Sequence, residues 1–383
     1  MKEWKLKECC LSISDGDHLP PPKSNAGIPF ITISNIDSTN HLDFKNTLFV
    51  PIEYYDKLDS IRKAQIGDII YSVVGSFGKP VLIKDNKKFA FQRHIAILRP
   101  NSSIVDSRYL YYVMLTREFY MQADSVAIGA AQRTISLTSL RNMKVKLPSL
   151  DFQQRIATIF SRYDSLIENY QKQIKLLEES AQRLYKEWFI DLRFPGHENT
   201  KIVDGVPEGW KKANLGTLIE FKRGKTITKK EVVEGNIPVV AGGLEPAYYC
   251  NKFNTSKRVI TISGSGANAG YTRMYFEKVW ASDCSFADSS MTPYLHFVFC
   301  FLHDNKTIID NMQKGAAQPH VYAKDINLME ICIPTEIMLK SFEERASKYF
   351  DTISSLQSQI RHLIEARDRL LPKLMCGEVI VNH

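Results

Sequence analysis

Residues 150–189 carry an unbroken heptad pattern, which constrains the fold of the chain more than any other feature. Apolar side chains alternate at steps of four and three residues, at Ile156, Phe160, Tyr163, Ile167, Tyr170, Ile174, Leu177, Ala181, Leu184 and Trp188. Such spacing is typical of a helix that packs lengthwise against another helix. Neither proline nor glycine interrupts the segment. At about 1.5 Å per residue the helix would be roughly 60 Å long.

The same segment recurs later in the chain. A shift of 186 residues (349 − 163) maps the heptad onto Phe342, Ala346, Tyr349, Ile353, Leu356, Ile360, Leu363 and Leu370, with Arg367 as its one polar interruption. This shift also aligns Gly129-Ala130-Ala131-Gln132 with Gly315-Ala316-Ala317-Gln318. A gap-free match of this length indicates an internal repeat. The chain therefore divides into two halves, each a globular part followed by a long helix.

Composition and charge narrow the class of protein. The 383 residues are enough for two buried cores. No apolar run approaches the roughly 20 residues of a membrane span, and the first residues lack the apolar segment of a signal peptide, so we expect a cytoplasmic protein. The seven cysteines show neither framework spacing nor a CxxC pair, which argues against disulfides and a zinc site. A net charge of +8 suits a nucleic-acid-binding protein without establishing one.

The globular parts are predicted to be rich in short strands. In the first half, apolar runs between Gly, Asn and Asp turns indicate strands at 28–33, 68–74, 81–83, 89–91, 94–98 and 143–147, with a helix at 107–121. In the second half, Ile237-Pro238 corresponds to Ile28-Pro29, and the strand at 259–262 corresponds to the strand before Gly75. Together with the long helices, these patterns predict an α+β fold.

The two halves differ in length. The offset between matching residues falls from 209 (238 − 29) to 189 (264 − 75), so about 20 residues between Pro29 and Gly75 lack a counterpart. Insertions belong in loops, which carry variable function. We divide the chain into globular domains at 1–149 and 206–335, a central helix at 150–190, a linker at 191–205, and a C-terminal helix with its tail at 336–383. We expect Pro372 to end or kink the last helix near Leu371.

Several segments come close to catalytic motifs without matching them. Gly224-Lys225-Thr226 resembles the end of a phosphate-binding loop, but Ile219 stands where that motif begins with glycine. The segment 264–270 has GxGxxxG spacing instead of the GxGxxG of a dinucleotide fingerprint. The histidines are dispersed, and Ser263 and Ser265 have no evident His and Asp partners. We therefore expect a non-catalytic chain that itself binds no cofactor or metal.

Two tandem copies of a β-rich globule and a long helix, without a catalytic centre, resemble the specificity (S) subunit of type I restriction–modification enzymes. The resemblance covers essentially the whole chain. It is carried by residues 184–196 (LYKEWFIDLRFPG) at the join of the halves, 206–210 (VPEGW) at the start of the second half, and 369–374 (RLLPKL) with 377–379 (GEV) near the C-terminus.

The resemblance implies two target recognition domains, each binding one half of a split, asymmetric DNA sequence. It also implies that the two long helices pack as an antiparallel coiled coil and set the gap between the half-sites. Adenine-N6 DNA methyltransferase (M) subunits, which bring S-adenosylmethionine, are expected to dock on the helices. Restriction/translocase (R) subunits, which use ATP and Mg²⁺, would complete an ATP-dependent endonuclease. Two rigidly spaced DNA-binding elements with a fixed gap agree with the geometry of dimeric DNA-binding proteins.

Two other functions stay open at this point. One is a specificity subunit of a related system, in which methyltransferase and nuclease form one partner chain. The other is a coiled-coil scaffold that does not bind DNA. The cluster Lys222-Arg223-Gly224-Lys225, followed by Lys229-Lys230, counts against the scaffold because such loops suit phosphate binding.

Basic and polar side chains of the globular domains are the candidate DNA contacts, since Arg and Lys suit guanine edges or phosphates and Gln suits adenine. In the first domain we select Lys79, Arg93 and Arg133, and in the second Lys222, Arg223, Lys225, Arg273, Gln318 and His320. The alternative for each Lys or Arg is an ordinary solvated charge. For the repeated Gly-Ala-Ala-Gln it is a structural turn before the last strand.

The predicted contacts between the two helices are the heptad positions Tyr163, Ile167, Tyr170, Ile174, Leu177, Tyr349, Ile353, Leu356, Ile360 and Leu363. Trp188 and Phe189 end the first helix. They either contact a methyltransferase subunit or cap the helix pair, and the sequence leaves both possibilities open.

Overall fold

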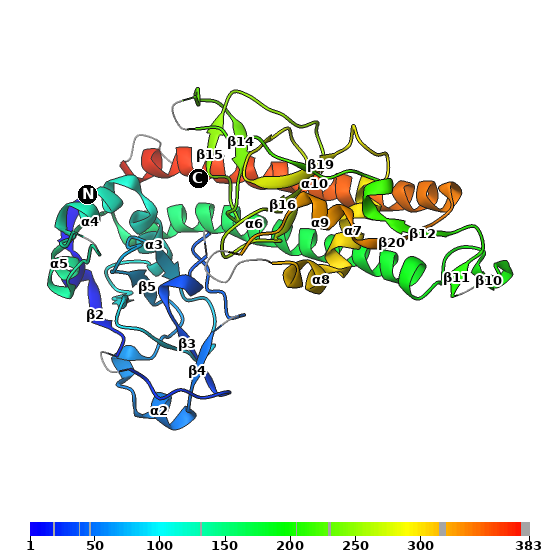
Figure 1. The fold of residues 1–383 in the computed structure, drawn as a ribbon. Helices are drawn as coiled ribbons and strands as arrows, with labels where there is room; N and C mark the ends of the chain where they lie inside the picture. Colours follow the sequence, from blue (N-terminus) through cyan, green and yellow to red (C-terminus); the bar gives the residue numbers. More distant parts are fainter. Residues whose placement is uncertain are drawn as a thin grey trace. The chain divides into compact units, whose positions relative to one another are not determined.

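The computed structural model describes residues 1–17, 20–37, 39–45, 47–130, 132–203, 205–228, 231–313 and 319–376. The chain forms two compact units (Figure 1). The first unit joins residues 1–168 to the chain from residue 361 onwards, and the second spans residues 169–360. Each unit thus contains one globular domain and a stretch of each long helix. None of the helices in the described ranges combines the length and apolarity needed to cross a lipid bilayer.

The first unit contains two small sheets and a strand pair. An antiparallel sheet has the order β2 (Cys10–Asp15), β8 (Ile95–Pro100), β5 (Ile69–Ser72) and β6 (Pro80–Leu82). The second sheet has the order β4 (Leu48–Val50), β3 (Ile28–Ile31) and β7 (Ala90–Phe91), with β3 and β7 parallel. Strand β1 (Lys2–Lys5) pairs with β9 (Lys144–Leu147), which leads directly into the long helix.

Short helices cover the four-stranded sheet of the first unit. They are α1 (Leu6–Cys9), α3 (Ser107–Leu115), α4 (Arg117–Val126) and α5 (Leu137–Asn142). The helix predicted at 107–121 is therefore two helices. They separate at Thr116, whose hydroxyl accepts the Phe119 N–H at 3.2 Å and caps α4. Threonine favours such a cap because its oxygen satisfies a backbone donor that the first turn leaves free.

The second unit repeats this topology strand for strand. Its larger sheet has the order β13 (Lys222–Arg223), β19 (Cys284–Asp288), β16 (Val259–Ser263) and β17 (Thr272–Tyr275). The smaller has the order β15 (Tyr248–Cys250), β14 (Ile237–Val240) and β18 (Trp280–Ala281), again with one parallel pair. Strand β12 (Lys211–Asn214) pairs with β20 (Glu330–Ile333). The helices are α7 (Leu295–Asp304), α8 (Lys306–Asn311) and α9 (Ala323–Asn327), after the short turn η5 (Leu215–Thr217).

The extra residues of the first half form a helical insertion. Between β3 and β5 lie η1 (Ile33–Asn35), β4, α2 (Ile52–Lys57) and η2 (Ser60–Arg62). Between β14 and β16, where every residue is described, β15 is the only element. We call residues 51–63 the insertion. It is present in the first unit alone, as the change of offset predicts.

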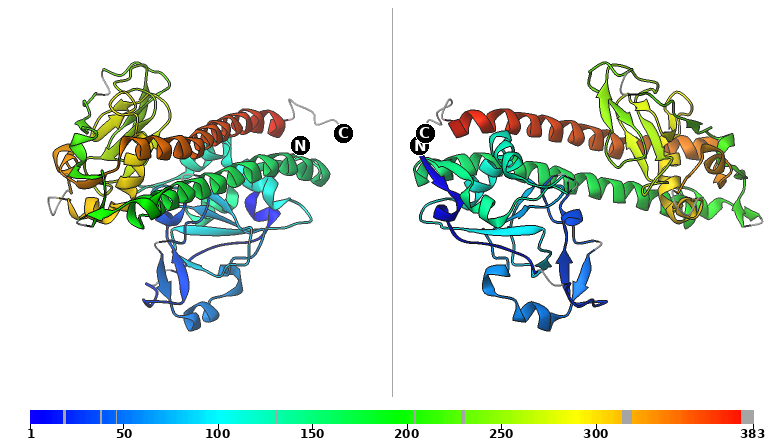
Figure 2. Two further views of the ribbon diagram at one scale, coloured as in Figure 1. Left: turned by 90° about the vertical axis from the view of Figure 1, so that its right-hand side faces the viewer. Right: turned by 60° about the vertical axis from the view of Figure 1, so that its left-hand side comes forward.

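The two long helices are α6 (Leu150–Tyr185), extended by a π-helical turn η3 (Lys186–Ile190), and α10 (Glu336–Cys376). Figure 2 shows them as long green and orange-to-red ribbons. In the first unit Phe160 of α6 shares a core with Leu371 and Leu374 of α10. In the second unit Tyr185 packs against Phe342 near the start of α10 at 6.2 Å between ring centroids. The pairing is antiparallel within each unit.

The expectation that the last helix ends near Leu371 is wrong, because α10 continues through Pro372 to Cys376. Proline removes one backbone donor and crowds the preceding turn. The carbonyl that loses its helical partner is that of Asp368, and Asp368 and Pro372 are both exposed, so water can bind there.

The helix pairs are buried at positions close to the predicted heptad. Ile167, Ile353 and Leu356 are buried, whereas Tyr163, Tyr170, Ile174, Leu177, Tyr349, Ile360 and Leu363 are half-buried. Phe350 and Leu371, at 2% and 4% exposed, are more deeply buried than the heptad residues that precede them, Tyr349 and Leu370. An α-helix turns every 3.6 residues and so drifts about 20° per heptad from a 3.5-residue repeat, which moves neighbouring residues into the contact.

After α6 come the short helix η4 (His197–Asn199) and two short antiparallel strands, β10 (Ile202–Val203) and β11 (Val206–Pro207). Phe194 of this segment is buried against Trp210, with ring centroids 5.1 Å apart. The linker therefore packs onto the second unit at this point.

Candidate nucleic-acid interface

In the first unit, the three candidate DNA contacts surround one glycine turn, residues 73–79 between β5 and β6. The Val73 N–H donates to the His94 carbonyl at 2.9 Å, and the Gly75 N–H donates to the Arg133 carbonyl at 2.8 Å. Lys79 closes the turn, and its N–H donates to Ser72 Oγ at 3.0 Å. Residues separated by up to 60 positions thus meet at one place, beside Arg93 and Arg133.

The side chains around this turn are not equally available. Arg93 is exposed and Lys79 is half-buried. The guanidinium of Arg133 forms an ion pair with Asp124, donates to the Ala127 carbonyl at 3.4 Å, and lies 5.4 Å above the Phe77 ring. These contacts fasten the turn to the end of α4, so Arg133 has an internal role whether or not it also contacts DNA.

The second unit has the matching turn at 264–270. The Gly264 carbonyl accepts from Val321 at 3.1 Å, and Ser265 forms a β-bridge with His320. The His320 ring stacks on Tyr322, 5.9 Å away and 13° from parallel. Gln318 lies outside the described residues, as does the rest of the second Gly-Ala-Ala-Gln.

Arg273 follows the second turn on β17. Its Nη1 donates to the Leu244 carbonyl at 2.8 Å and lies 3.6 Å from Glu245, and its guanidinium is 4.8 Å from the Tyr275 ring. Like Arg133, it makes contacts within its own unit. The sequence does not identify either set of acceptors: those of Arg133 lie six and nine residues earlier at the end of α4, and Leu244 lies 29 residues before Arg273.

The clearest candidate in the second unit is the loop of residues 222–225, which we call the basic loop. Lys222 and Arg223 form the edge strand β13, and all three basic side chains are exposed. The backbone is held tightly, with the Gly224 N–H donating to the Cys284 carbonyl at 2.8 Å and the Lys225 N–H to the Ala281 carbonyl at 2.9 Å. Fixed backbone and solvated cations suit phosphate or guanine contacts. Lys229 and Lys230 lie outside the described residues.

Only glycine fits at the centre of the basic loop. A Cβ on Gly224 would lie 2.2 Å from the Ser282 carbonyl oxygen. The same is true of Gly16 at the matching place in the first unit, where a Cβ would lie 2.1 Å from the Phe91 oxygen. The sequence of the first loop is Asp15-Gly16-Asp17, and we call it the acidic loop.

The acidic loop is bound by the insertion. The Tyr54 hydroxyl on α2 donates to Asp17 Oδ2 at 3.0 Å, and Arg62 on η2 lies 3.9 Å from Asp17 Oδ1. Burial, and next the hydrogen bond to Asp17, raise the pKa of Tyr54 to about 12. The hydroxyl therefore stays a donor at neutral pH. No motif in the sequence singles out this loop, although its offset of 208 (224 − 16) lies between those of neighbouring matches.

Carboxylates on the long helices hold each globular domain in its unit. In the first, Glu168 of α6 accepts from Lys84 at 2.5 Å and interacts with His41 Nε2 at 3.1 Å. The His41 hydrogen bond and then Lys84 lower the pKa of Glu168 to about 2. In the second, Glu343 of α10 accepts the N–H groups of His296 and Phe297 at 2.9 and 3.0 Å, and its other oxygen lies 2.6 Å from His296 Nδ1. Different positions in the repeat thus serve the same purpose.

Trp188 and Phe189 belong to the core of the second unit. They are 4% and 8% exposed, and their rings lie 5.9 and 5.1 Å from Phe342. Of the two possibilities that the sequence leaves open, the structure places both residues in the cap of the helix pair.

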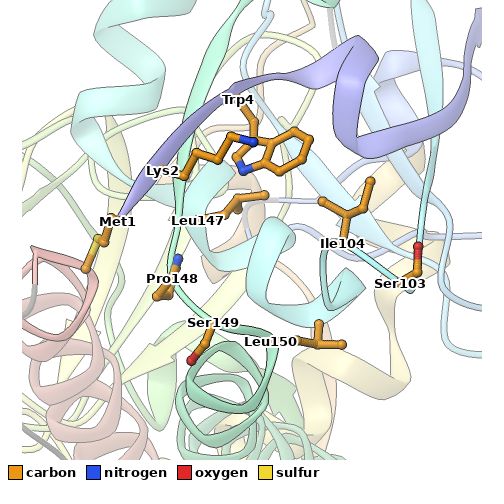
Figure 3. A pocket seen from close by; sticks show the side chains of 9 residues that line it. All are labelled: Met1, Lys2, Trp4, Ser103, Ile104, Leu147, Pro148, Ser149 and Leu150. Carbon is orange, nitrogen blue, oxygen red and sulfur yellow. The ribbon is translucent and has the colours of Figure 1, made fainter.

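An open pocket of about 640 Å³ lies where β1 and β9 meet the start of α6 (Figure 3). It is lined by Met1, Lys2, Trp4, Ser103, Ile104, Leu147, Pro148, Ser149 and Leu150. The Lys2 ammonium lies 4.1 Å from the Trp4 ring centroid. The matching Trp210 of the second unit is instead covered by Phe189 and Phe194. In the described ranges, no three His, Cys, Asp or Glu side chains are grouped so as to hold a metal.

Comparison with known proteins gives a consistent result. The family model described as the type I restriction modification DNA specificity domain matches residues 2–179 and 207–366. The specificity subunit of type I restriction enzyme MjaIX from Methanocaldococcus jannaschii is 29% identical over 309 residues, which cover 74% of this chain and 71% of that protein. The HindI specificity subunit from Haemophilus influenzae is 22% identical, over 91% of this chain and 95% of its own length.

The fold is also found in a solved structure. The crystal structure of the type I restriction–modification S subunit from M. genitalium aligns with a TM-score of 0.57 at 18% identity. The alignment covers 97% of this chain and 95% of that one. Both copies of the repeat and both long helices therefore belong to one known architecture.

Proposed function

Since the chain belongs to the family of type I restriction–modification DNA specificity subunits, we propose that its two globular domains each bind one half of a split, asymmetric DNA target. The observation that carries this proposal is one topology repeated with opposite charges at matching places. The acidic loop is bound by the insertion in the first unit, and the basic loop is exposed in the second. Two globular domains of the same topology that present different side chains to DNA would recognise different half-sites.

In the second domain, Lys222, Arg223 and Lys225 are the proposed contacts to phosphates or guanine edges. In the first domain, Arg93 and Lys79 beside the glycine turn take this role. Arg133, Arg273, Gln318 and His320 stay predictions as DNA contacts. For Arg133 and Arg273 the internal hydrogen bonds support a second role, which is to hold the loops that present their neighbours.

The proposed partners follow from the family. We propose that methyltransferase subunits carry S-adenosylmethionine and that restriction/translocase subunits carry ATP and Mg²⁺, so that the assembly methylates adenine N6 and cuts DNA in an ATP-dependent reaction. The present chain would supply DNA recognition and the spacer between the half-sites. Two rigidly spaced sites fix the gap in the target because neither can move along the duplex independently of the other.

The decisive experiment is methylome sequencing of a host that makes this chain with its cognate methyltransferase, compared with a host lacking only this chain. We expect one split, asymmetric adenine-methylated motif to disappear. Persistence of every methylated motif in an active system would contradict the proposal and leave the scaffold function as the better one.

Replacement of Arg223 and Lys225 by alanine tests the basic loop. For the chain assembled with its methyltransferase, we expect weaker DNA binding and a slope of log affinity against log salt that is smaller by about two, because each phosphate contact releases about one counterion. The matched control is Lys211→Ala with Lys212→Ala, two exposed lysines on β12, which belongs to a different strand pair. An equal loss in the control would show a non-local charge effect and remove the loop from the interface.

A further inference from the structure

A polar cluster interrupts the apolar packing of the helix pair in the first unit. Asp164 of α6 accepts from the Tyr112 hydroxyl through Oδ2 at 2.7 Å and from Arg367 Nη1 of α10 through Oδ1 at 3.0 Å. The side chains of Asp164 and Arg367 are 11% and 20% exposed, and Tyr112 is 2% exposed. Both carboxylate oxygens are therefore occupied, one by the globular domain and one by the other long helix.

The repeat replaces all three polar residues by apolar ones. The shift of 186 residues takes Asp164 to Phe350, Tyr112 to Val298, and, in the reverse direction, Arg367 to Ala181. These three are 2%, 0% and 1% exposed and share the core of the second unit. The same site in the fold is thus an ion pair with a tyrosine in one copy and a hydrophobic contact in the other.

A buried ion pair is a poor way to stabilise a helix pair. Removing two charges from water opposes their attraction, and well-packed apolar residues of similar volume serve as well or better. The second unit shows that this fold accepts the apolar solution. The best-attested use of a polar pair in a helix interface is to determine which helices pair, and in which register.

We infer that Asp164 and Arg367, with Tyr112, select the pairing of α6 with α10 and exclude pairing of each helix with its own kind from a second copy of the chain. Because α6 and α10 are repeats of each other, such like-with-like pairing is the natural competitor. This inference goes beyond DNA recognition and does not depend on which sequence is bound.

The register of the repeat shows what each competing pair would bury. If α6 paired with α6 of a second copy, Asp164 would face Ala181 of the other chain at both ends of the pair. If α10 paired with α10, Arg367 would face Phe350 at both ends. The α6–α6 arrangement leaves two Asp164 carboxylates without a cation from the facing helix. The α10–α10 arrangement leaves each Arg367 with Asp368 of its own helix, 2.9 Å away and 56% exposed, in place of a carboxylate from the facing helix. The α6–α10 pair supplies the ion pair across the helices. An unpaired charge at an interface is a strong determinant against the wrong partner.

Charge reversal in the full chain tests this directly. Asp164→Arg places two cations together, and Arg367→Asp places two carboxylates together, so each single variant should be impaired. Differently tagged Asp164→Arg and Arg367→Asp chains, made in one cell, can restore both ion pairs by exchanging long helices in a dimer. We expect at least a tenfold increase in co-purification over either variant paired with itself, at twice the monomer mass. The same two reversals in one chain should restore the monomer. Absence of the mixed dimer would overturn the inference.

A second variant keeps the test informative if the single reversals do not fold. It carries the residues of the other copy, namely Tyr112→Val, Asp164→Phe and Arg367→Ala. We expect the unfolding temperature of this variant to equal or exceed that of the wild-type chain. We also expect two differently tagged copies of the variant to co-purify after co-expression, whereas two tagged copies of the wild-type chain should not. A folded variant that stays as unmixed as the wild type would overturn the inference, because loss of the polar cluster would then have no effect on partner choice.

Discussion

The acidic loop of the first unit and the basic loop of the second occupy the same place in the fold and carry opposite charges. Their backbones agree because each centres on a glycine pressed against a neighbouring carbonyl. Their side chains differ because only the first unit has the insertion, whose Tyr54 and Arg62 bind Asp17. The comparison teaches that duplication has preserved the backbone, while the charged side chains and the insertion have diverged together.

The shared backbone predicts the largest effect. Gly16→Val and Gly224→Val should each cost about 3 kcal/mol or more of the free energy of unfolding, since a Cβ would overlap a backbone oxygen that cannot move aside. The measurement is urea unfolding of the full chain, with tryptophan fluorescence as the probe of the transition. Gly243→Ala is the comparison, because its Cβ would make a tight contact of 3.3 Å with the Glu245 carbonyl oxygen, about 1 Å longer than the overlap in either loop, and should cost much less. Equal losses in both loops would confirm the common geometry, and a loss in one loop alone would contradict it.

The divergent side chains predict an intermediate effect of unequal size in the two loops. Asp17→Asn should cost about 1–2 kcal/mol, because it weakens the hydrogen bond from Tyr54 and the attraction of Arg62. Lys225→Gln should change the stability by less than about 0.5 kcal/mol, because the side chain is exposed. Binding should show the reverse order, with Lys225→Gln the more harmful to DNA affinity. If both substitutions destabilised the chain equally, the basic loop would also be a structural element.

The smallest predicted effect concerns pH and the contact of the first domain with α6. The folded-state pKa of Glu168 is about 2, below its ordinary value of 4.5, chiefly through the His41 hydrogen bond. A lowered carboxyl pKa stabilises the fold above the ordinary pKa, and this stabilisation is lost as pH falls from about 4.5 towards 2. Since the Glu168 side chain is 29% exposed, we expect its ionisation to contribute about 1 kcal/mol to the free energy of unfolding.

Unfolding of the wild-type chain and of Glu168→Gln, compared between about pH 5 and pH 2.5, measures this contribution. The difference in stability between the two chains should shrink as the pH falls. In the second unit the matching position is Ser354, which does not ionise in this range, so this position should make no pH-dependent contribution to stability. A difference that stays constant with pH would show that the Glu168 contact does not depend on its charge.

Local patterns were sufficient for the long elements and insufficient for the side-chain partners. The heptad predicts α6 to its last turn, and the glycine turns locate the ends of β5 and β16. The helix at 107–121 is divided by a single cap at Thr116, and α10 passes Pro372 because water can replace the missing hydrogen bond. Such departures depend on solvent exposure and on caps, which a periodic pattern does not encode.

For the candidate interface, the sequence located the loops and left the environment of their side chains undetermined. Lys222, Arg223 and Lys225 are exposed as a DNA contact requires, whereas Arg133 and Arg273 bind acceptors in their own units. A positive charge is visible in the sequence, but the acceptor that it binds depends on how the chain folds. The role of the acidic loop is not evident from the sequence for the same reason, since it depends on Tyr54 and Arg62 of the insertion, which bind Asp17.

The sequence by itself determined the duplicated architecture, the two long helices and the DNA specificity family, because these rest on periodicity and on local motifs that survive in one dimension. Only the tertiary structure decided that Arg367, an interruption of the heptad, binds Asp164, which also accepts from Tyr112, and that the matching site in the second unit is apolar. Two charges separated by 203 residues become partners only when the chain folds back on itself. The free energy of a buried charge depends on that partner, which the linear order does not specify.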